Sequence, residues 1–425
     1  MKTRTLMRHR LGTLMLLTLL IAYAFICMTR SCFNAAMASI VQLGVFTKTQ
    51  TGVISAVFYA FYGVLQVLGG IVTDRYHPEH LVTVGFVGAS ISNFIIFFNQ
   101  NYVVILCAWA FNAIAQFAVW PAIFKLLSTM LPRDMRSNAL FATTFVNPAG
   151  VVMSYLVAAI VSTHWQMNFL ISAIGLAAFA ILWEWVIHVI KPHIWETEHA
   201  PAIRPTAPNA AQNAPQSDTS FFKIILTSGL IFCFLLAFAR TSSDTSIRNL
   251  TSTMLNESYD SLNPVLSNLL SIIVLASGTM GTMLARLLYP RVIKNEAVAL
   301  TIFLGLAFPC SCGLLLLGKV HYVWMIAFLA VIALLMGATT IFTMTYIAAR
   351  FGKWGKGATV AGAMNCTASI GVVVANSVSP MLADAFSWRV VTIFWICLIA
   401  LTLFLALILV PIWTKFWRKQ EQSVV

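Results

Sequence analysis

The chain has 425 residues, of which 60% are hydrophobic and only 9% are charged, with a formal net charge of +13. Soluble domains carry about 25% charged residues, so the composition excludes an ordinary soluble enzyme or binding module. The positive balance fits the loops of a membrane protein, and we expect no nucleic-acid partner.

The first half of the chain is a series of six apolar blocks. A helix needs about 20 apolar residues to cross a bilayer. Inside lipid the backbone must satisfy its own hydrogen bonds, so these blocks are predicted to be helices. They lie at 11–40, 49–73, 80–98, 102–131, 137–162 and 166–191.

The stretch 192–220 is the longest hydrophilic passage and is rich in Pro, Ala, Asn and Gln. It shows no apolar period, so we expect a cytoplasmic linker. It separates a predicted domain 1–191 from a second domain, 221–425. The second domain repeats the pattern with blocks at 221–248, 262–286, 297–318, 320–348, 357–384 and 387–414. The sequence therefore predicts an all-α membrane protein with twelve transmembrane helices in two six-helix bundles.

The basic residues predict the orientation of these helices. If the blocks alternate in direction, nineteen Lys and Arg residues fall on one side of the membrane. The other side holds only Lys48, Lys319 and Arg389. The positive-inside rule then places both termini and the linker in the cytoplasm. We expect a multi-pass protein of the plasma membrane, that is, the cytoplasmic or inner membrane, in contact with lipid and monomeric.

Two short motifs recur at corresponding places in the two halves. One motif follows the second block and returns after the eighth, and the other lies in the fifth block and returns in the eleventh. The matched segments are Gly70 to Arg75 with Gly281 to Arg286, and Ala149 to Val152 with Ile370 to Val373. Parallel repeats of this kind are typical of transporters whose substrate site lies between the halves.

Ionisable residues inside apolar helices are expensive and therefore indicate function. Arg30 lies 19 residues after Leu11, and Arg240 lies 19 residues after Phe221. We expect the two guanidiniums to lie at equal depth on opposite walls of one cavity, where they would bind an anion bidentately. Lys125 is a third candidate, which could instead reach the inner membrane surface. Asp244, one turn after Arg240, could join the site or pair with Arg240.

Several of these residues resemble the motifs of the major facilitator superfamily. The signature Gly, then Asp-Arg, after helix 2 is present at Gly70, Asp74 and Arg75, with Arg286 in the second copy. In that family it implies a cytoplasmic latch that gates the carrier. Closer likeness is to the organophosphate:phosphate antiporters, such as glycerol-phosphate and hexose-phosphate transporters. Further points of likeness are Arg30, Trp120 to Lys125, and Arg350 to Lys356.

The resemblance also identifies departures from that family. Gln66 stands where the antiporters carry a helix 2 Lys, and Val146 stands where they carry a helix 5 His. An ungapped comparison puts Asp244 where they carry a helix 7 Arg. Tyr62 and Trp120 are the aromatic residues expected beside the bound solute.

We therefore expect a secondary active transporter that moves a small organic anion, a phosphorylated metabolite or a carboxylate, by alternating access. A transporter-like receptor for such an anion is one alternative. A proton-coupled drug or cation exporter is another, although it should carry acids inside the apolar blocks of the first half. The one acid in those blocks is Glu184, near a helix end. No catalytic constellation, metal-ligand spacing or cofactor motif is found, so we expect neither an enzyme nor a cofactor.

Overall fold

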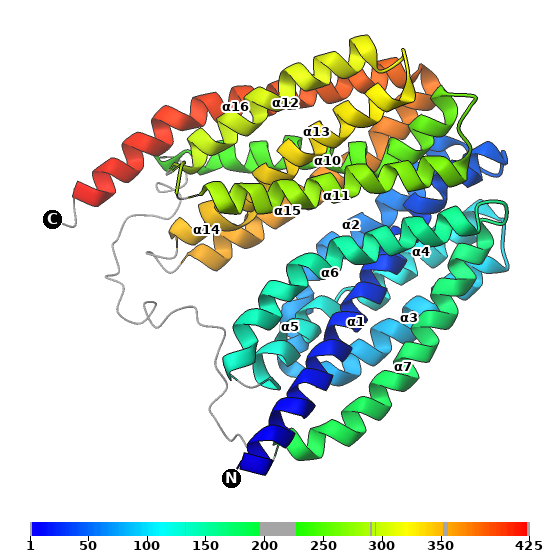
Figure 1. The fold of residues 1–425 in the computed structure, drawn as a ribbon, viewed down its shortest axis with the longest axis vertical. Helices are drawn as coiled ribbons and strands as arrows, with labels where there is room; N and C mark the ends of the chain where they lie inside the picture. Colours follow the sequence, from blue (N-terminus) through cyan, green and yellow to red (C-terminus); the bar gives the residue numbers. More distant parts are fainter. Residues whose placement is uncertain are drawn as a thin grey trace. The chain divides into compact units, whose positions relative to one another are not determined.

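The computed structural model describes residues 2–131, 133–195, 227–289, 291–293, 295–351 and 356–422. Every regular element in these ranges is a helix (Figure 1). Contacts between Cα atoms divide the chain into two compact units. Unit 1 comprises Met1–Pro205 with Pro264–Leu269, and unit 2 comprises Thr206–Asn263 with Leu270–Val425. The predicted linker falls largely outside the described residues, so the predicted domain boundaries stay a prediction.

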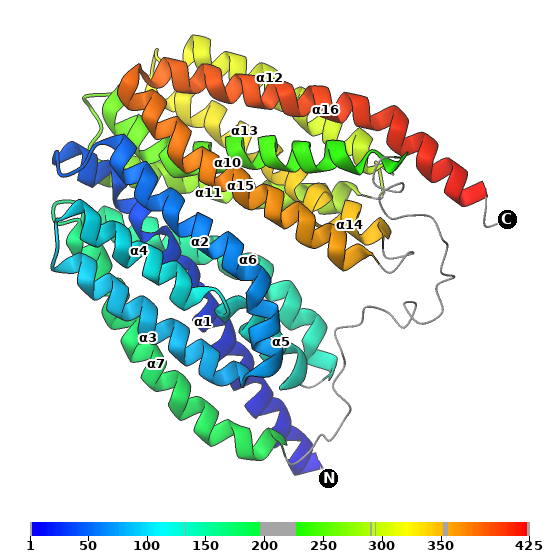
Figure 2. The ribbon, with the colours of Figure 1, turned by 180° about the vertical axis from the view of Figure 1, so that it is seen from behind.

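Unit 1 is built from seven labelled helices, seen from both sides in Figures 1 and 2. They are α1 (Lys2–Gln42), α2 (Lys48–Arg75), α3 (Pro78–Phe97), α4 (Tyr102–Gln116), α5 (Val119–Thr129), α6 (Arg133–Ile160) and α7 (Gln166–Trp195). The predicted block 102–131 is thus two consecutive helices. The α7 helix continues to Trp195, beyond the predicted start of the linker at Pro192. A proline removes one backbone hydrogen bond, and a long helix can tolerate that loss.

Unit 2 contains the remaining helices. They are α10 (Leu230–Ser258), α11 (Pro264–Leu288), α12 (Glu296–Leu317), α13 (Tyr322–Ile341), the π-helix η1 (Phe342–Tyr346), α14 (Ile347–Arg350), α15 (Gly357–Ala385) and α16 (Trp388–Gln422). Gly229, with φ of +76°, precedes α10 and occupies the left-handed region that glycine adopts without strain. The α10 helix therefore begins later than the predicted start at 221, and residues 221–226 lie outside the described part.

Length and hydropathy identify the membrane spans. Ten helices of the described chain are long and apolar enough to cross a membrane, and α2, which is bent after Gln66, makes an eleventh. In α6 the apolar stretch Phe145–Ile160 is shorter. Each of the twelve predicted blocks corresponds to one helix or to consecutive helices, and the prediction of a multi-pass helical membrane protein is confirmed.

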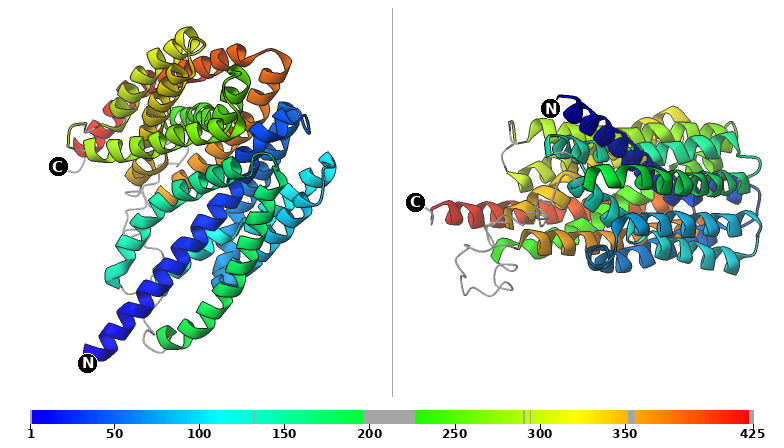
Figure 3. Two further views of the ribbon diagram at one scale, coloured as in Figure 1. Left: turned by 45° about the vertical axis from the view of Figure 1, so that its right-hand side comes forward. Right: turned by 90° about the horizontal axis from the view of Figure 1, so that it is seen from below.

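The internal repeat extends from the sequence to the packing within each unit. In unit 1, α1 packs on α6, and α3 packs on both α4 and α7. In unit 2, α10 packs on α15, and α12 packs on both α13 and α16. The long helices within each unit lie alongside one another in the two views of Figure 3. The two units therefore repeat one packing scheme.

Two matched glycines fix the register of this repeat. A methyl group at Gly150 of α6 would lie 2.4 Å from the carbonyl oxygen of Ala24 and 3.1 Å from the amide nitrogen of Met28. A methyl group at Gly371 of α15 would lie 2.6 Å from the carbonyl oxygen of Phe238 and 3.2 Å from the amide nitrogen of Ser242. Glycine is needed at both crossings because the backbones approach so closely. Ala24 thus corresponds to Phe238 and Met28 to Ser242, the same shift of 214 positions.

Unit 2 also contains a buried carboxylate that the sequence analysis did not single out. Glu296, in the first turn of α12, is 1% exposed. It accepts hydrogen bonds from Nε of Arg350 at 2.8 Å, from the Tyr289 hydroxyl at 2.6 Å and from Nε1 of Trp413 at 3.1 Å. Burial, together with this carboxylate, raises the pKa of Tyr289 to about 12. Arg350 therefore ties α14 to α12, so this basic residue has a structural role at the end of the unit.

Candidate functional site

Arg30 lies in the middle of α1 and is held by two neighbouring helices. Its Nε donates a hydrogen bond of 2.8 Å to Oε1 of Gln116 at the end of α4. Its guanidinium carbon lies 4.3 Å from the centre of the Tyr62 ring on α2, a cation–π contact. Gln116 is itself oriented by Asn112, whose Oδ1 accepts a 2.5 Å hydrogen bond from Nε2 of Gln116. Within the part of the chain that the structure describes, the groups that position the guanidinium are uncharged.

This cluster leaves two hydrogen-bond donors without acceptors. Nη2 of Arg30 and Nδ2 of Asn112 are both buried and have no hydrogen-bond partner among the described residues. A buried donor without an acceptor costs about 1–3 kcal/mol, and more when it is charged. An arrangement with a full positive charge and unmet donors suits an oxyanion ligand.

Three other predicted residues of unit 1, Tyr62, Gln66 and Trp120, lie on the helices α2 and α5. Tyr62 stacks on Phe58, with ring centres 5.9 Å apart and planes at 10°. Gln66, one turn further along α2, is half-buried. Trp120 of α5 stacks on Tyr23 of α1 with ring centres 4.4 Å apart. The structure therefore brings Tyr62 to Arg30, and it sets Trp120 against Tyr23, two turns before Arg30 in α1.

Lys125, for which the sequence left two places open, contacts the end of α2. Its Nζ donates a 2.6 Å hydrogen bond to the carbonyl oxygen of Thr73 and lies 3.8 Å from Oδ1 of Asp74. A cation at the last turn of α2 stabilises the unpaired carbonyls and the negative end of that helix. The described contacts therefore associate Lys125 with the end of α2 and the predicted latch residue Asp74. They do not join it to Arg30.

A close helix contact lies at Gly69, one residue before the first residue of the latch motif. A methyl group at Gly70 would meet nothing within 4 Å, whereas one at Gly69 would lie 2.9 Å from the carbonyl oxygen of Phe117. In the second copy, a methyl group at Gly281 would lie 1.7 Å from the carbonyl oxygen of Leu334. Gly69 and Gly281 are therefore the equivalent packing glycines. Asp74, Arg75 and Arg286 are exposed, and their gating role stays a prediction.

Arg240 and Asp244 of α10 form a buried ionic cluster with Arg248. Nη1 of Arg240 donates to Oγ1 of Thr340 at 2.8 Å and lies 3.5 Å from Oδ2 of Asp244. Nε of Arg248 donates to Oδ1 of Asp244 at 2.8 Å. Arg240 is 3% exposed and Asp244 is 8% exposed. The pairing of Asp244 with Arg240, left open by the sequence, is present, and Arg248 folds back onto the same carboxylate.

The prediction of equal depth for Arg30 and Arg240 does not follow from the repeat seen in the helix packing. It rested on counting from Phe221, whereas α10 begins at Leu230. The glycine contacts give the correct register, because their shift of 214 positions carries Arg30 to Asp244. Arg240 lies four residues, or about 6 Å, closer to the start of α10 than the counterpart of Arg30. The position equivalent to Arg30 thus carries the opposite charge.

The Arg240 cluster adjoins two irregular features of its neighbours. Thr340, which accepts from Arg240, closely precedes the π-helical segment η1. Such segments are often found at functional sites. A methyl group at Gly278 of α11 would lie 2.4 Å from Nη2 of Arg248, so this glycine provides the space for the guanidinium.

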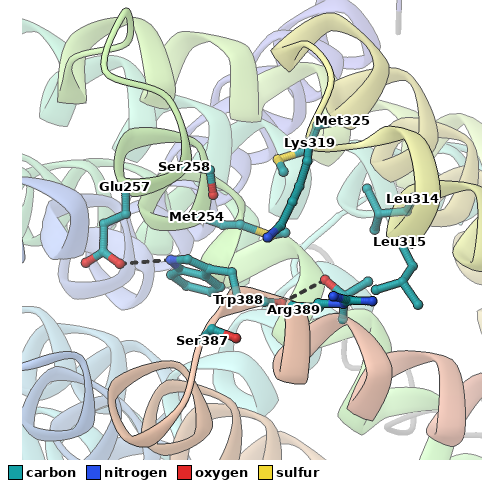
Figure 4. A pocket seen from close by; sticks show the side chains of 11 residues that line it. Met254, Glu257, Ser258, Leu314, Leu315, Lys319, Met325, Ser387, Trp388 and Arg389 are labelled. Carbon is teal, nitrogen blue, oxygen red and sulfur yellow. Dashed lines mark hydrogen bonds between the residues drawn. The ribbon is translucent and has the colours of Figure 1, made fainter.

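A separate polar pocket of about 310 Å³ lies at the far end of α10 in unit 2 (Figure 4). Lys319 and Arg389 line it together with Glu257, whose carboxylate accepts a 2.8 Å hydrogen bond from Nε1 of Trp388. Lys319 and Arg389 are two of the three basic residues that the sequence assigned to the side opposite the linker. The structure brings them to the same end of unit 2.

Comparison with known proteins identifies the family. The chain matches the model of the Major Facilitator Superfamily over residues 19–375. The chain belongs to the major facilitator superfamily. This confirms the family suggested by the Gly70, Asp74 and Arg75 signature.

Curated relatives of this superfamily member include membrane sensor proteins and probable hexose phosphate transport proteins. The membrane sensor protein UhpC of Salmonella typhimurium is 28% identical over 168 residues, which cover 39% of this chain and 38% of the relative. A probable hexose phosphate transport protein of Chlamydia trachomatis is 25% identical over 121 residues, which cover 28% of this chain and 26% of the relative. The matches thus span well under half the length of these relatives.

Solved structures support the same fold. An inward-facing bacterial homologue of the human lysosomal transporter Spinster superposes with a TM-score of 0.71 at 14% identity, covering 95% of this chain and 98% of the other. The nucleoside transporter NupG gives a TM-score of 0.67 at 14% identity, covering 94% and 98%. At this identity the likeness shows the fold alone.

Sequence reasoning missed the two amides that orient Arg30 in this superfamily member. Asn112 and Gln116 lie four residues apart in an otherwise apolar helix, and both are fully buried. Their spacing puts both side chains on one face of α4. Buried amides in a lipid-embedded helix need partners inside the protein. That signal could have identified them from the sequence.

Proposed function

We propose that this chain carries a small organic anion, a phosphate monoester or a carboxylate, across the membrane by alternating access, with Arg30 as the principal ligand of the anion. The observation that carries the proposal is the buried Nη2 of Arg30, which has no acceptor among the described residues. A positive charge in the middle of a membrane helix is costly unless a ligand or partner neutralises it. The probable hexose phosphate transport proteins among the relatives favour the same chemical class.

Geometry distinguishes the roles of the residues around Arg30. Tyr62 covers the flat face of the guanidinium, and Gln116 occupies Nε. These contacts leave the Nη edge to the anion, whose oxygens match the planar fork of arginine. Asn112 would add a neutral donor. We propose Gln66 and Trp120 as outer contacts of the solute and Asp74 with Arg75 as the gate.

The test is direct transport and binding by the purified chain. Thermal-shift screening against organic phosphates and carboxylates identifies the anion, because a ligand that binds only the folded state raises the melting temperature. Uptake of that anion into liposomes then measures transport. If no organic anion stabilises the protein and none is taken up, the proposal is wrong.

A second candidate function is sensing, since two relatives are membrane sensor proteins. A sensor would bind the anion and change conformation without sustained flux. Saturable binding without uptake or counterflow in liposomes would favour this alternative.

A further inference from the structure

The cluster formed by Arg240, Asp244 and Arg248 has a role that the anion-carrier function does not by itself require. We propose that Asp244 is an exchangeable internal anion: a substrate oxyanion displaces its carboxylate from Arg240, and Asp244 then takes up a proton. Anion and proton would therefore bind together. This inference rests on the proposed anion-carrier function and adds its coupling ion.

The first supporting observation is the position of Asp244. The glycine contacts on α1 and α10 make Asp244 the counterpart of Arg30 in the repeat. Arg30 is the residue of unit 1 whose guanidinium lacks an acceptor. Unit 2 thus presents a carboxylate at the position where unit 1 presents an anion-binding group.

The second observation is that the two arginines contact Asp244 at different distances. Arg248 holds Oδ1 at 2.8 Å, whereas Nη1 of Arg240 is 3.5 Å from Oδ2 and is closer to Thr340, at 2.8 Å. A hydrogen bond at 3.5 Å is weak. Arg240 is therefore the partner that Asp244 can release at the lower cost.

The third observation is a donor that the cluster does not satisfy. Nε of Arg240 is buried and has no hydrogen-bond partner among the described residues, and the whole residue is only 3% exposed. An oxyanion bound to Nε and an Nη atom in the bidentate mode would satisfy this donor. The existing contact with Asp244 leaves it unmet.

The surroundings of Asp244 determine the fate of its carboxylate once Arg240 is released. The charged groups that contact it in the described chain are Arg240 and Arg248, both on its own helix. The packed helices supply uncharged groups to this region: Thr340 and the Met336 carbonyl from α13 to Arg240, Gly278 from α11 beside Arg248, and Ser379 from α15 to Ser246. A buried carboxylate that loses a counter-ion in such surroundings binds a proton more readily.

Charge balance makes the exchange feasible in a membrane. The empty cluster holds two guanidiniums and one carboxylate, a net charge of +1. When a dianion binds and one proton adds to Asp244, the net charge is 0, whereas without the proton it would be −1. Without the proton, a second buried negative charge would be left beside the first, which is unfavourable. Linkage then requires that protons and anions promote one another's binding.

The test counts protons taken up on binding. Calorimetric titrations of the full chain with succinate and with glucose 6-phosphate are carried out near pH ~8 in Tris and in HEPES, where both probes are fully ionised. The difference between buffers gives the number of protons bound with the anion. We expect about one proton per anion for the wild-type chain, as linkage requires. Binding without proton uptake overturns the inference while leaving the anion-carrier function intact.

Variants assign the proton to Asp244. Asp244→Asn should still bind the anion, with proton uptake falling to about zero, because the amide resembles the protonated acid. Asp244→Glu should retain uptake. Asp260→Asn, at an exposed acid after α10, is the matched control and should behave as wild type. Undiminished uptake in Asp244→Asn refutes the assignment. If the wild-type chain binds neither probe, the proposed function and this inference both fail.

Discussion

Arg30 in α1 of unit 1 and Asp244 in α10 of unit 2 occupy equivalent positions of the repeat. Arg30 is held by an amide and an aromatic ring, so its charge remains available. Asp244 is held by two arginines, so the charge of its carboxylate is matched within α10. The difference lies in the ionic partners: among the described residues Arg30 contacts uncharged groups, whereas Asp244 contacts two guanidiniums.

The largest effect is expected from removing the free charge. Arg30→Ala should reduce anion uptake by more than about 30-fold, equivalent to roughly 2 kcal/mol, because a buried ionic contact is lost. Arg30→Lys keeps the charge but lacks the planar fork, so a large loss is expected there too. Liposome uptake, normalised to reconstituted protein, is the measurement. Wild-type rates in both variants would make Arg30 a structural residue.

The substitution Gln116→Glu would place a carboxylate beside Arg30, as Asp244 lies beside Arg240 in unit 2. Gln116→Glu places a carboxylate at the atom that now accepts from Nε of Arg30 at 2.8 Å. The new pair should weaken anion binding by about 10-fold, or roughly 1.4 kcal/mol, by neutralising the guanidinium. Binding affinity from thermal shifts provides the measurement. Gln116→Leu is the matched control, since it removes the acceptor without adding charge. Equal affinity in Gln116→Glu and wild type would contradict the free-charge role of Arg30.

The packing glycines offer a structural test of the repeat that does not involve transport. Gly281→Ala should lower stability by about 2 kcal/mol, because the methyl group meets the Leu334 carbonyl and the helices must separate. Gly70→Ala, where a methyl group meets nothing within 4 Å, should be nearly neutral. Melting temperatures in detergent compare the two. Equal destabilisation would show that the equivalence of Gly69 with Gly281 is mistaken.

The smallest stability effect is expected at the end of α2. Lys125→Met removes a pair with Asp74, whose side chain is 85% exposed, so the loss should stay below about 1 kcal/mol. Asp74→Asn should have an equally small effect on melting temperature, yet it should shift the carrier toward its inward-open state if the latch operates. Distances between spin labels on the cytoplasmic ends of the two units measure that shift. An unchanged distance distribution would reject the latch.

The fold could be predicted from sequence because the deciding property is local. A block such as 387–414 crosses a bilayer by virtue of its own length and apolarity, and lipid forces a helix wherever such a block occurs. The matched motifs around Gly150 and Gly371 predicted the internal repeat, because each motif is also a short local pattern in the sequence. Element ends were less accurate, as the start of α10 shows, because Gly229 breaks a stretch whose hydropathy continues unchanged.

Sequence by itself determined the family, the helical blocks and the small set of charges inside them. It identified Arg30, Arg240 and Asp244, because a charge in an apolar block is visible without any partner. Only the tertiary structure decided which charges are available. Arg30 meets Gln116 across 86 positions, whereas Lys125 reaches Thr73 across 52. Such pairings depend on which helix faces come together, and packing sets this. That Arg30 and Asp244 occupy equivalent positions with opposite charges became clear only from the contacts of Gly150 and Gly371, which give the register of α1 and α10.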